Sequence, residues 1–329
     1  MRYLGSSTSI EASVRDLESP SVRVRVEAAE RLGRVPPEER DRAAAALRPR
    51  LEDHSPDVRY MTALSLGRLQ DREAVEALSR MARDEDEPMP RQAAISALGE
   101  IGDPSAAEIL IEALRSSAAE VRFQAAIALP RVAPEAAVEP LGAALDDDDA
   151  EVRACAAAAL GDLGHEGSRD RLVELLSDPE QQVRMEAATA LSRMGDRRGT
   201  AVLIHALQDR DFRLLAAEHL FRCPDPAARG ALNSALVRWM APPLLKVWAA
   251  GALVKLGDEQ ARSHLVRLLH HKNEPVRGLA IQVLGAIDQP WSRTTLESLL
   301  EPKNAQDFAG WGDEIREALA GRRSGTPSA

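Results

Sequence analysis

Two acidic runs are the residues best suited by type to bind a cation. Residues 146–151 read "DDDDAE" and residues 84–88 read "DEDEP". A calcium loop of the EF-hand type needs ligands at alternate positions, a glycine at the sixth position and a glutamate at the twelfth, and neither run has this spacing. Carboxylates just before a helix also complement the positive end of its dipole. We therefore expect both runs to be capping turns, without a bound metal.

Histidine and cysteine offer little further chemistry. The one His-Glu dipeptide is His165-Glu166, and His264 and His271 are seven residues apart with no accompanying carboxylate pattern. Cys155 could act as a nucleophile, but no basic residue stands near it to lower its pKa. The chain has no G-x-S-x-G, P-loop, G-x-G-x-x-G or H-E-x-x-H motif. We therefore predict no catalytic residue, no metal and no cofactor, and interpret the chain as not an enzyme.

Charge and hydropathy limit the partners. The formal net charge is −10 and the isoelectric point is near 5.4, whereas binding to nucleic-acid phosphates needs a basic surface. No apolar run approaches the ~18 residues of a membrane-spanning helix, and the N-terminus lacks the apolar core of a secretory signal. These features predict a cytoplasmic protein with no nucleic acid and no membrane among its partners.

A repeat runs along most of the chain. The segment "EVRACAAAALGDLG" at residue 151 recurs as "DVRYMTALSLGRL" at 57, "EVRFQAAIALPRV" at 120 and "QVRMEAATALSRM" at 182, with looser copies elsewhere. A basic residue marks every copy at intervals of 29 to 34 residues: Arg25, Arg59, Arg91, Arg122, Arg153, Arg184, Arg213, Lys246 and Arg277. A fixed period of this length is typical of helical repeat proteins.

Each repeat is predicted to be a pair of helices. Before each copy lies a second helical pattern, such as "DPSAAEILIEALRSS" from Asp103, in which aspartate is the N-cap and proline opens the first turn. We expect a left-handed glycine to end the second helix of several repeats, at Gly33, Gly67, Gly99, Gly161 and Gly285. Because a helix pair cannot bury its apolar stripe alone, neighbours must stack. The predicted fold is all-α, a right-handed α-solenoid of about nine to ten helix pairs.

These segments resemble the HEAT-like repeats first grouped with phycobilin lyases, over about residues 8–300. The resemblance implies a fold and not one function, because the group spans adaptors, bilin lyases, an iron-dependent hydroxylase and DNA glycosylases. The hydroxylase carries several His-Glu dipeptides that converge on two metals, whereas this chain has one. We expect a single solenoid over residues 1–320, in which 301–320 are a degenerate C-terminal cap, and a disordered tail at 321–329.

The repeated basic residue has two interpretations. In the resembling DNA glycosylases it would suggest a row of phosphate contacts. Its strict period favours a structural role, because Asp53, Asp147 and Asp178 stand six residues before Arg59, Arg153 and Arg184. We expect each of these pairs to form an ion pair across the turn between the two helices of a repeat.

A concave groove is the predicted binding surface. Counting the residue before the repeated arginine as zero, positions 0, 4, 7 and 8 share one helix face and form the core. The resemblance implies that the second helices line the concave surface, so positions 2, 3 and 6 should face a groove. The candidate groove residues are Tyr60, Met61, Leu64, Ile95, Phe123, Ile127, Met185, Leu214, Leu215, Val247, Trp248 and Leu279. The alternative is that some of them pack against the next repeat.

Charge is unevenly distributed along the chain. Residues 1–200 carry 26 basic and 38 acidic residues, a net charge of −12, whereas residues 201–329 carry 16 basic and 14 acidic residues, a net charge of +2. The sequence thus predicts a non-enzymatic protein-binding scaffold with an apolar and acidic groove for a segment of another protein. The alternatives are a bilin lyase or chromophore chaperone and, disfavoured by the acidic groove, a solenoid that binds DNA lesions.

Overall fold

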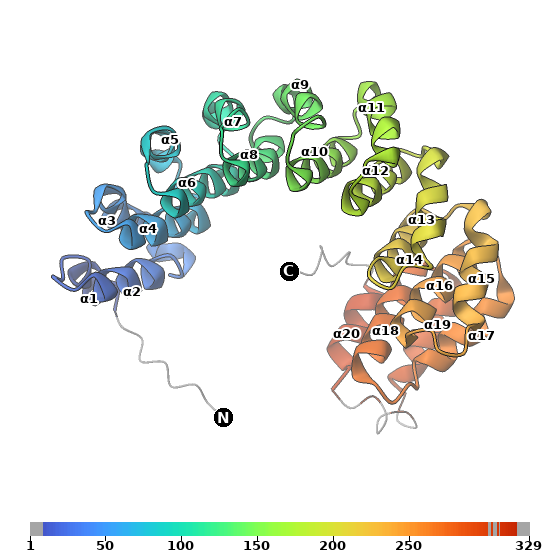
Figure 1. Cartoon of the computed structure of the whole chain (residues 1–329). Coiled ribbons are helices and arrows are strands. Elements are labelled where there is room, and N and C mark those ends of the chain that lie inside the picture. Colours follow the sequence, from blue (N-terminus) through green and yellow to red (C-terminus); the bar gives the residue numbers. More distant parts are fainter. Residues whose placement is uncertain (1–8, 302–303, 305–307, 309, 321–329) are drawn as a thin grey trace. The chain divides into compact units, whose positions relative to one another are not determined.

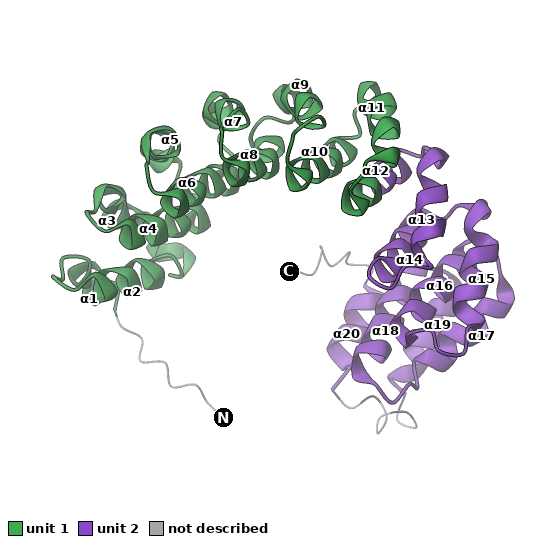
Figure 2. Ribbon diagram, viewed as in Figure 1, with its two compact units in different colours: residues 1–186 green, residues 187–329 purple. Residues whose placement is uncertain are grey.

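A computed structural model describes residues 9–301, 304, 308 and 310–320, and that part of the chain contains helices and no strand. The chain divides into two compact units, residues 1–186 and residues 187–329 (Figure 2). Each unit is described here by itself.

Unit 1 is a row of helix pairs (Figure 1). Its helices are α1 (Ile10–Asp16), α2 (Val22–Leu32), α3 (Arg40–Leu47), α4 (Pro56–Leu69), α5 (Val75–Asp84), α6 (Pro88–Ile101), α7 (Ala107–Ala113), α8 (Ala119–Val132), α9 (Pro134–Ala144), α10 (Ala150–Leu163), α11 (Arg169–Glu174) and the first part of α12 (Gln181–Arg193). Short 3-10 turns precede or extend several of the odd-numbered helices.

Unit 2 repeats the same arrangement with α13 (Thr200–Ala206), α14 (Arg213–Arg222), α15 (Arg229–Val237), α16 (Pro243–Lys255), α17 (Glu259–Leu268), α18 (Glu274–Ile287), α19 (Pro290–Leu299) and α20 (Gly312–Leu319). Even-numbered helices of successive pairs pack side by side in both units, as α4 does with α6 and α16 with α18. Their cores consist largely of alanine and leucine, with Ala63, Leu66, Ala250 and Leu253 completely buried.

The predicted glycine stops are wrong. Gly67 lies inside α4 and Gly99 inside α6, and neither has a positive φ. A Cβ atom on Gly67 would stand 2.9 Å from the Cα of Ala97, and one on Gly99 would stand 2.7 Å from the Cβ of Ala128. These glycines therefore allow successive even-numbered helices to approach closely, which leaves no room for a side chain.

The left-handed residue comes three positions later in four of these repeats. It is Gln70 (φ 56°), Gly102 (φ 67°), Gly164 (φ 64°) and Asp288 (φ 48°), after Gly67, Gly99, Gly161 and Gly285 respectively. Gly33 does follow α2 directly, but with φ −71°. The sequence prediction had assigned two requirements to one glycine. The close helix contact and the chain reversal are in fact met by two different residues, three positions apart.

The predicted fold class, an all-α arrangement of stacked helix pairs, is confirmed within each unit. That the two units continue as a single solenoid over residues 1–320 stays a prediction. The described part of the predicted cap contains α20, which packs on α18 and α19. The predicted tail, residues 321–329, lies outside the described residues. Among the described helices, none has the length and apolar character needed to cross a membrane.

Candidate functional site

The repeated arginines link neighbouring repeats in unit 1. The Nε and Nη2 atoms of Arg25 donate to the carboxylate of Asp53 in the next repeat, at 2.9 and 2.8 Å. Arg122 binds Asp147 in the same way at 2.7 and 2.6 Å, and Arg153 binds Asp178 at 2.9 and 3.0 Å. The third nitrogen, Nη1, donates to a backbone carbonyl six residues earlier in each case. Each guanidinium thus fastens one interhelical turn to the next.

The partners differ from the expected ones. Arg59 donates to the carboxylate of Glu85 in the next repeat at 2.7 Å. From Asp53 it binds the backbone carbonyl and not the carboxylate. The Asp53 carboxylate instead accepts from Arg25 of the preceding repeat and from the backbone N–H of Ser55. The turn amide orients the carboxylate toward the preceding repeat. The expected pairing within a repeat is therefore wrong, and the pairs join different repeats.

Electrostatics favour the charged form of these pairs. Burial alone would raise the pKa of Asp53, Asp147 and Asp178, but hydrogen bonds from an arginine and a turn amide outweigh it, and each pKa lies below its ordinary value. The side chains of Arg153 and Asp178 are only 13% and 6% exposed. A guanidinium already occupied on three sides has little capacity left for a phosphate, so the geometry does not favour a row of phosphate contacts.

The pairing is not uniform along the chain, and the exceptions include Arg91 of α6, which lies in unit 1 between Arg59 and Arg122. Arg91 donates from Nε to the backbone carbonyl of Ala82, and Arg277 donates from Nη1 to that of His271. The Nε atoms of Arg213 and Arg277 are buried without a hydrogen-bond partner in the part of the chain that the structure describes. The bidentate pairing with a carboxylate of the next repeat is therefore not made by every repeated arginine, in unit 1 or in unit 2.

Two aspartates of the acidic run at 146–149 have different structural roles. Asp147 pairs with Arg122, and the Asp149 carboxylate accepts hydrogen bonds from the backbone N–H groups of Glu151 and Val152 at 2.9 and 3.2 Å, which caps α10. The expectation of a capping turn is confirmed for Asp149. Within the described residues, no group of three or more His, Cys, Asp or Glu side chains is arranged to hold a metal ion. His165 is exposed, with Nδ1 3.0 Å from the Ser168 hydroxyl.

The structure separates the candidate groove residues into accessible and buried ones. Ile95, Met185 and Val247 are at most 1% exposed and cannot contact a partner as the chain is folded. Ile95 occupies position 5 of its repeat, outside the register that defined the groove. Met185 and Val247 are buried because a second helix in a stack has neighbours on both flanks, which extends burial beyond a single arc. The other nine residues are partly accessible: Tyr60, Met61, Leu64, Phe123, Ile127, Leu214, Leu215, Trp248 and Leu279.

Five of the accessible residues form what we call the α4/α8 face: Tyr60, Met61 and Leu64 on α4, and Phe123 and Ile127 on α8. Both helices pack against α6, which lies between them. Exposed Asp57 and Glu120 precede Met61 and Phe123 by four and three residues, spacings that place them on the same side of each helix. The face therefore consists of two apolar strips, on α4 and α8, on either side of the partly accessible Gln92 and Ser96 of α6, with carboxylates near the N-terminal ends of α4 and α8.

Trp248 has a packing role as well as partial exposure. Its ring lies 5.3 Å from that of Phe221, and the Nζ atom of Lys255 lies 4.0 Å from the centre of the Phe221 ring. Burial lowers the pKa of Lys255, and burial together with Arg193 and Arg222 lowers the pKa of His219 to about 4. His219 is therefore neutral at physiological pH.

Neither structure nor electrostatics activates Cys155. Burial, with Glu186 nearby, raises the pKa of its thiol to about 12. The nucleophilic form is the thiolate, so this side chain is a poor nucleophile at neutral pH.

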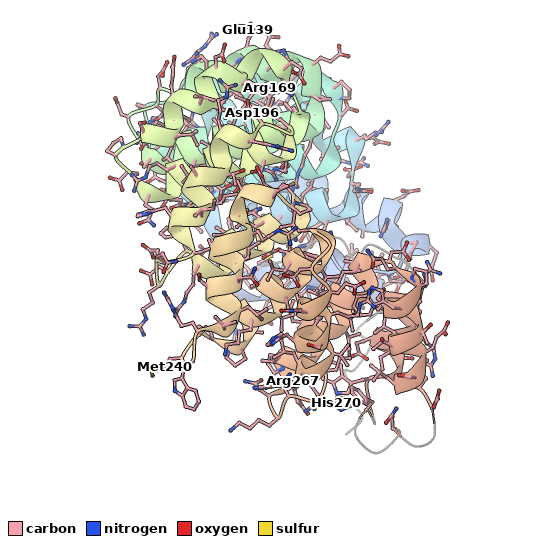
Figure 3. The ribbon with its side chains drawn as sticks, turned by 90° about the vertical axis from the view of Figure 1, so that its right-hand side faces the viewer. Glu139, Arg169, Asp196, Met240, Arg267 and His270 are labelled. Carbon is pink, nitrogen blue, oxygen red and sulfur yellow. The ribbon has the colours of Figure 1, made fainter. Side chains whose placement is uncertain are left out.

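Sequence reasoning missed a group of exposed apolar residues at the end of α15 and in the turn that leads to α16. Val237, Trp239 and Met240 are 70%, 92% and 85% exposed, and we call them the α15–α16 knob. Figure 3 shows the labelled Met240 projecting beyond the ribbon of unit 2. The signal was present in "LVRWMAPP", where large apolar residues stand in a turn between the core residue Leu236 and two prolines.

Comparison with known proteins places the repeats. The family described as HEAT repeats matches residues 10–97, 44–130, 78–157, 138–222 and 231–311. The YibA protein of Escherichia coli has a solved structure that is 22% identical, with a TM-score of 0.54, covering 76% of this chain and 92% of that one. Kap95p, solved with RanGDP, is 12% identical with a TM-score of 0.50, covering 95% of this chain and 50% of that one. At these identities the likeness shows the fold alone.

One relative is an enzyme. Deoxyhypusine hydroxylase of Drosophila melanogaster is 36% identical over 91 residues, which are 27% of this chain and 30% of that protein. This match corrects the prediction that the chain is not an enzyme. That prediction rested on the absence of short catalytic motifs, and the chain shares sequence with an enzyme although it lacks them. The matched segment is 30% of the relative's length, and the hydroxylase activity is a property of that relative.

The repeat pattern, the helix-pair architecture and the family match over most of the chain agree. The chain belongs to the HEAT-repeat family.

Proposed function

We propose that this protein is a HEAT-repeat scaffold that binds a segment of a partner protein on the α4/α8 face. The observation that carries the proposal is the presence of five partly accessible apolar side chains on two second helices of one unit. In the repeat copies that contain α2, α4, α6, α8, α10 and α12, positions 2, 3 and 6 hold no lysine or arginine. Accessible apolar residues grouped on a protein surface commonly mark an interaction site.

The chemistry of the face suggests the type of partner. An amphipathic helix that places an apolar stripe in a groove is a recurrent mode of recognition. Asp57 and Glu120 at one end of the face would favour a segment with a basic residue beside its apolar stripe. The Kap95p neighbour was solved in a complex with RanGDP, and this shows that a solenoid with a similar fold binds a protein partner.

The test is a double substitution, Tyr60→Asp with Phe123→Asp, followed by affinity capture and cross-linking from a photoreactive residue at position 127. We expect wild type to cross-link an amphipathic segment, and the double variant to lose at least about tenfold in affinity for that segment. The matched control is Ala45→Asp with Ala136→Asp, which adds the same charges at exposed sites on α3 and α9. Capture by the double variant equal to that of wild type, with circular dichroism unchanged, would refute the proposal.

The enzyme match supplies a second candidate, hydroxylation of deoxyhypusine. Its support is the 36% identity over 91 residues to deoxyhypusine hydroxylase. Incubation of the purified chain with a deoxyhypusine-containing protein substrate, ferrous iron, dioxygen and a reductant, with mass spectrometry of the product, tests it directly. A mass increase of one oxygen atom on the substrate would support this function, and an unmodified substrate beside an active reference enzyme would exclude it.

A further inference from the structure

The α15–α16 knob is the most exposed apolar feature of the described residues. Trp239 and Met240 are 92% and 85% exposed, and Val237 is 70% exposed. Tryptophan is frequent among the residues that dominate interface energies, and methionine adapts its shape to irregular surfaces. Two such side chains side by side in a turn contribute nothing to the core, so their presence calls for an external partner.

The knob includes a positive charge, and contacts on both sides restrict its backbone. Arg238 stands between Val237 and Trp239, and its Nη2 atom donates to the side-chain Oε1 of Gln208 at 2.7 Å. This bond ties the turn after α15 to the turn after α13. Pro242 and Pro243 follow the knob and begin α16, which restricts the backbone on the other side. The apolar tip is therefore presented in a restricted geometry beside a cation.

The same chain carries a surface of complementary character. The α4/α8 face has partly accessible apolar side chains on α4 and on α8, with exposed Asp57 and Glu120 at one end of these helices. Residues 1–200 have a net charge of −12 and residues 201–329 a net charge of +2. Opposite charges on two surfaces steer their encounter and set their relative orientation. The two surfaces also occur in equal number, one of each on every chain.

We propose that the α15–α16 knob of one chain docks on the α4/α8 face of a second copy, with Trp239 and Met240 against Phe123 and Ile127 of α8 and with Arg238 near Glu120. The contact is heterologous, since two different surfaces meet, and it therefore produces either a closed ring or an open chain of copies. This inference rests on the proposed partner-binding face and names a second copy as one of its occupants.

The test is sedimentation velocity of the full chain over a concentration series. We expect wild type to associate as its concentration rises. Trp239→Asp with Met240→Asp should weaken association by at least about tenfold, and Tyr60→Asp with Phe123→Asp should do the same. The knob residues are exposed, so their substitution leaves the core intact, and Leu300→Asp is the matched control at an exposed apolar residue of unit 2.

Mixing the two variants gives the decisive result. The knob variant retains an intact face and the face variant retains an intact knob, so an equimolar mixture should form a heterodimer that does not grow further. A mixture that stays monomeric, or a wild type that is monomeric at every concentration, overturns the inference. Association of the knob variant equal to that of wild type also overturns it, because the contact would then lie elsewhere.

Failure of this inference is distinguishable from failure of the proposed function. If wild type is monomeric while the face variant still loses its amphipathic partner, only the self-association is wrong. If the face variant retains both self-association and binding of the amphipathic partner, the assignment of the α4/α8 face as a binding surface is wrong. Binding of wild type, but not of the knob variant, to lipid vesicles or to an unrelated protein in the absence of self-association would assign the knob to that occupant instead.

Discussion

At the scale of single residues, the inter-repeat ion pairs are the most specific feature of unit 1. An ion pair on the surface contributes about 0–1 kcal/mol to the free energy of unfolding. Removing one partner of a half-buried, hydrogen-bonded pair lowers that free energy by more, because the other partner is left unsatisfied. Asp147 is such a case, because it accepts from Arg122 and from the backbone N–H of Asp149. Its neighbour Asp148 is exposed.

Asp147→Asn should therefore lower the free energy of unfolding by about 1–3 kcal/mol at pH 7, whereas Asp148→Asn should change it by less than about 0.5 kcal/mol. The pKa of Asp147 is lowered in the folded state, so its stabilisation is present above the unfolded pKa of about 3.9 and is lost as the pH falls through the folded pKa. The difference between wild type and Asp147→Asn should narrow on acidification below pH ~4. Denaturant titrations across that range measure it, and a difference independent of pH would contradict the assignment.

At the scale of elements, the sequence period was sufficient to predict helix pairs and their stacking. The core positions repeat along the chain, and alanine-rich second helices pack closely. The period did not separate glycines that permit contact from residues that reverse the chain, because Gly99 and Gly102 both stand near the end of one pattern. Nor did it place Asp53, whose partner lies in the preceding repeat, since spacing along one chain does not tell which neighbour a side chain faces.

The candidate site was predicted less completely than the fold. The face of a single helix was enough to locate Tyr60 and Phe123 but not to show that Met185 and Val247 are buried by flanking helices. Burial in a stack depends on neighbours that a helical wheel does not represent. The α15–α16 knob was missed because the search followed the repeated helix positions, and Trp239 and Met240 lie in a turn outside those positions.

Helix contact at Gly99 yields a prediction with an internal control. Gly99→Ala places a Cβ atom where Ala128 now lies, and we expect the forced separation of α6 and α8 to cost about 1–3 kcal/mol. Gly142 in α9 has no atom within 4 Å of the corresponding position, so Gly142→Ala should instead stabilise by about 0.5–1 kcal/mol through helix propensity. Thermal unfolding of the two variants compares them, and opposite shifts in Tm are expected. Equal shifts would show that close approach at Gly99 is unimportant.

At the scale of the whole molecule, repeat proteins are held together mainly by contacts between nearest neighbours. The consequence of weakening one repeat should therefore be local. In Asp147→Asn we expect faster amide hydrogen exchange in α8 and α10, with exchange in α16 and α18 unchanged, as measured by mass spectrometry. Uniformly faster exchange throughout the chain would mean that the molecule opens as one cooperative unit, contrary to this expectation.

The direction of the ion pairs in unit 1 has a consequence for how such a chain can lengthen. A repeat such as the one holding Asp53 and Arg59 accepts from the repeat before it and donates to the repeat after it. If a genetic duplication inserts one whole repeat, the new copy brings both a carboxylate and an arginine, so neither old neighbour loses its counter-charge. Gain or loss of part of a repeat breaks this balance. The pairing thus favours lengthening of the chain by whole repeats.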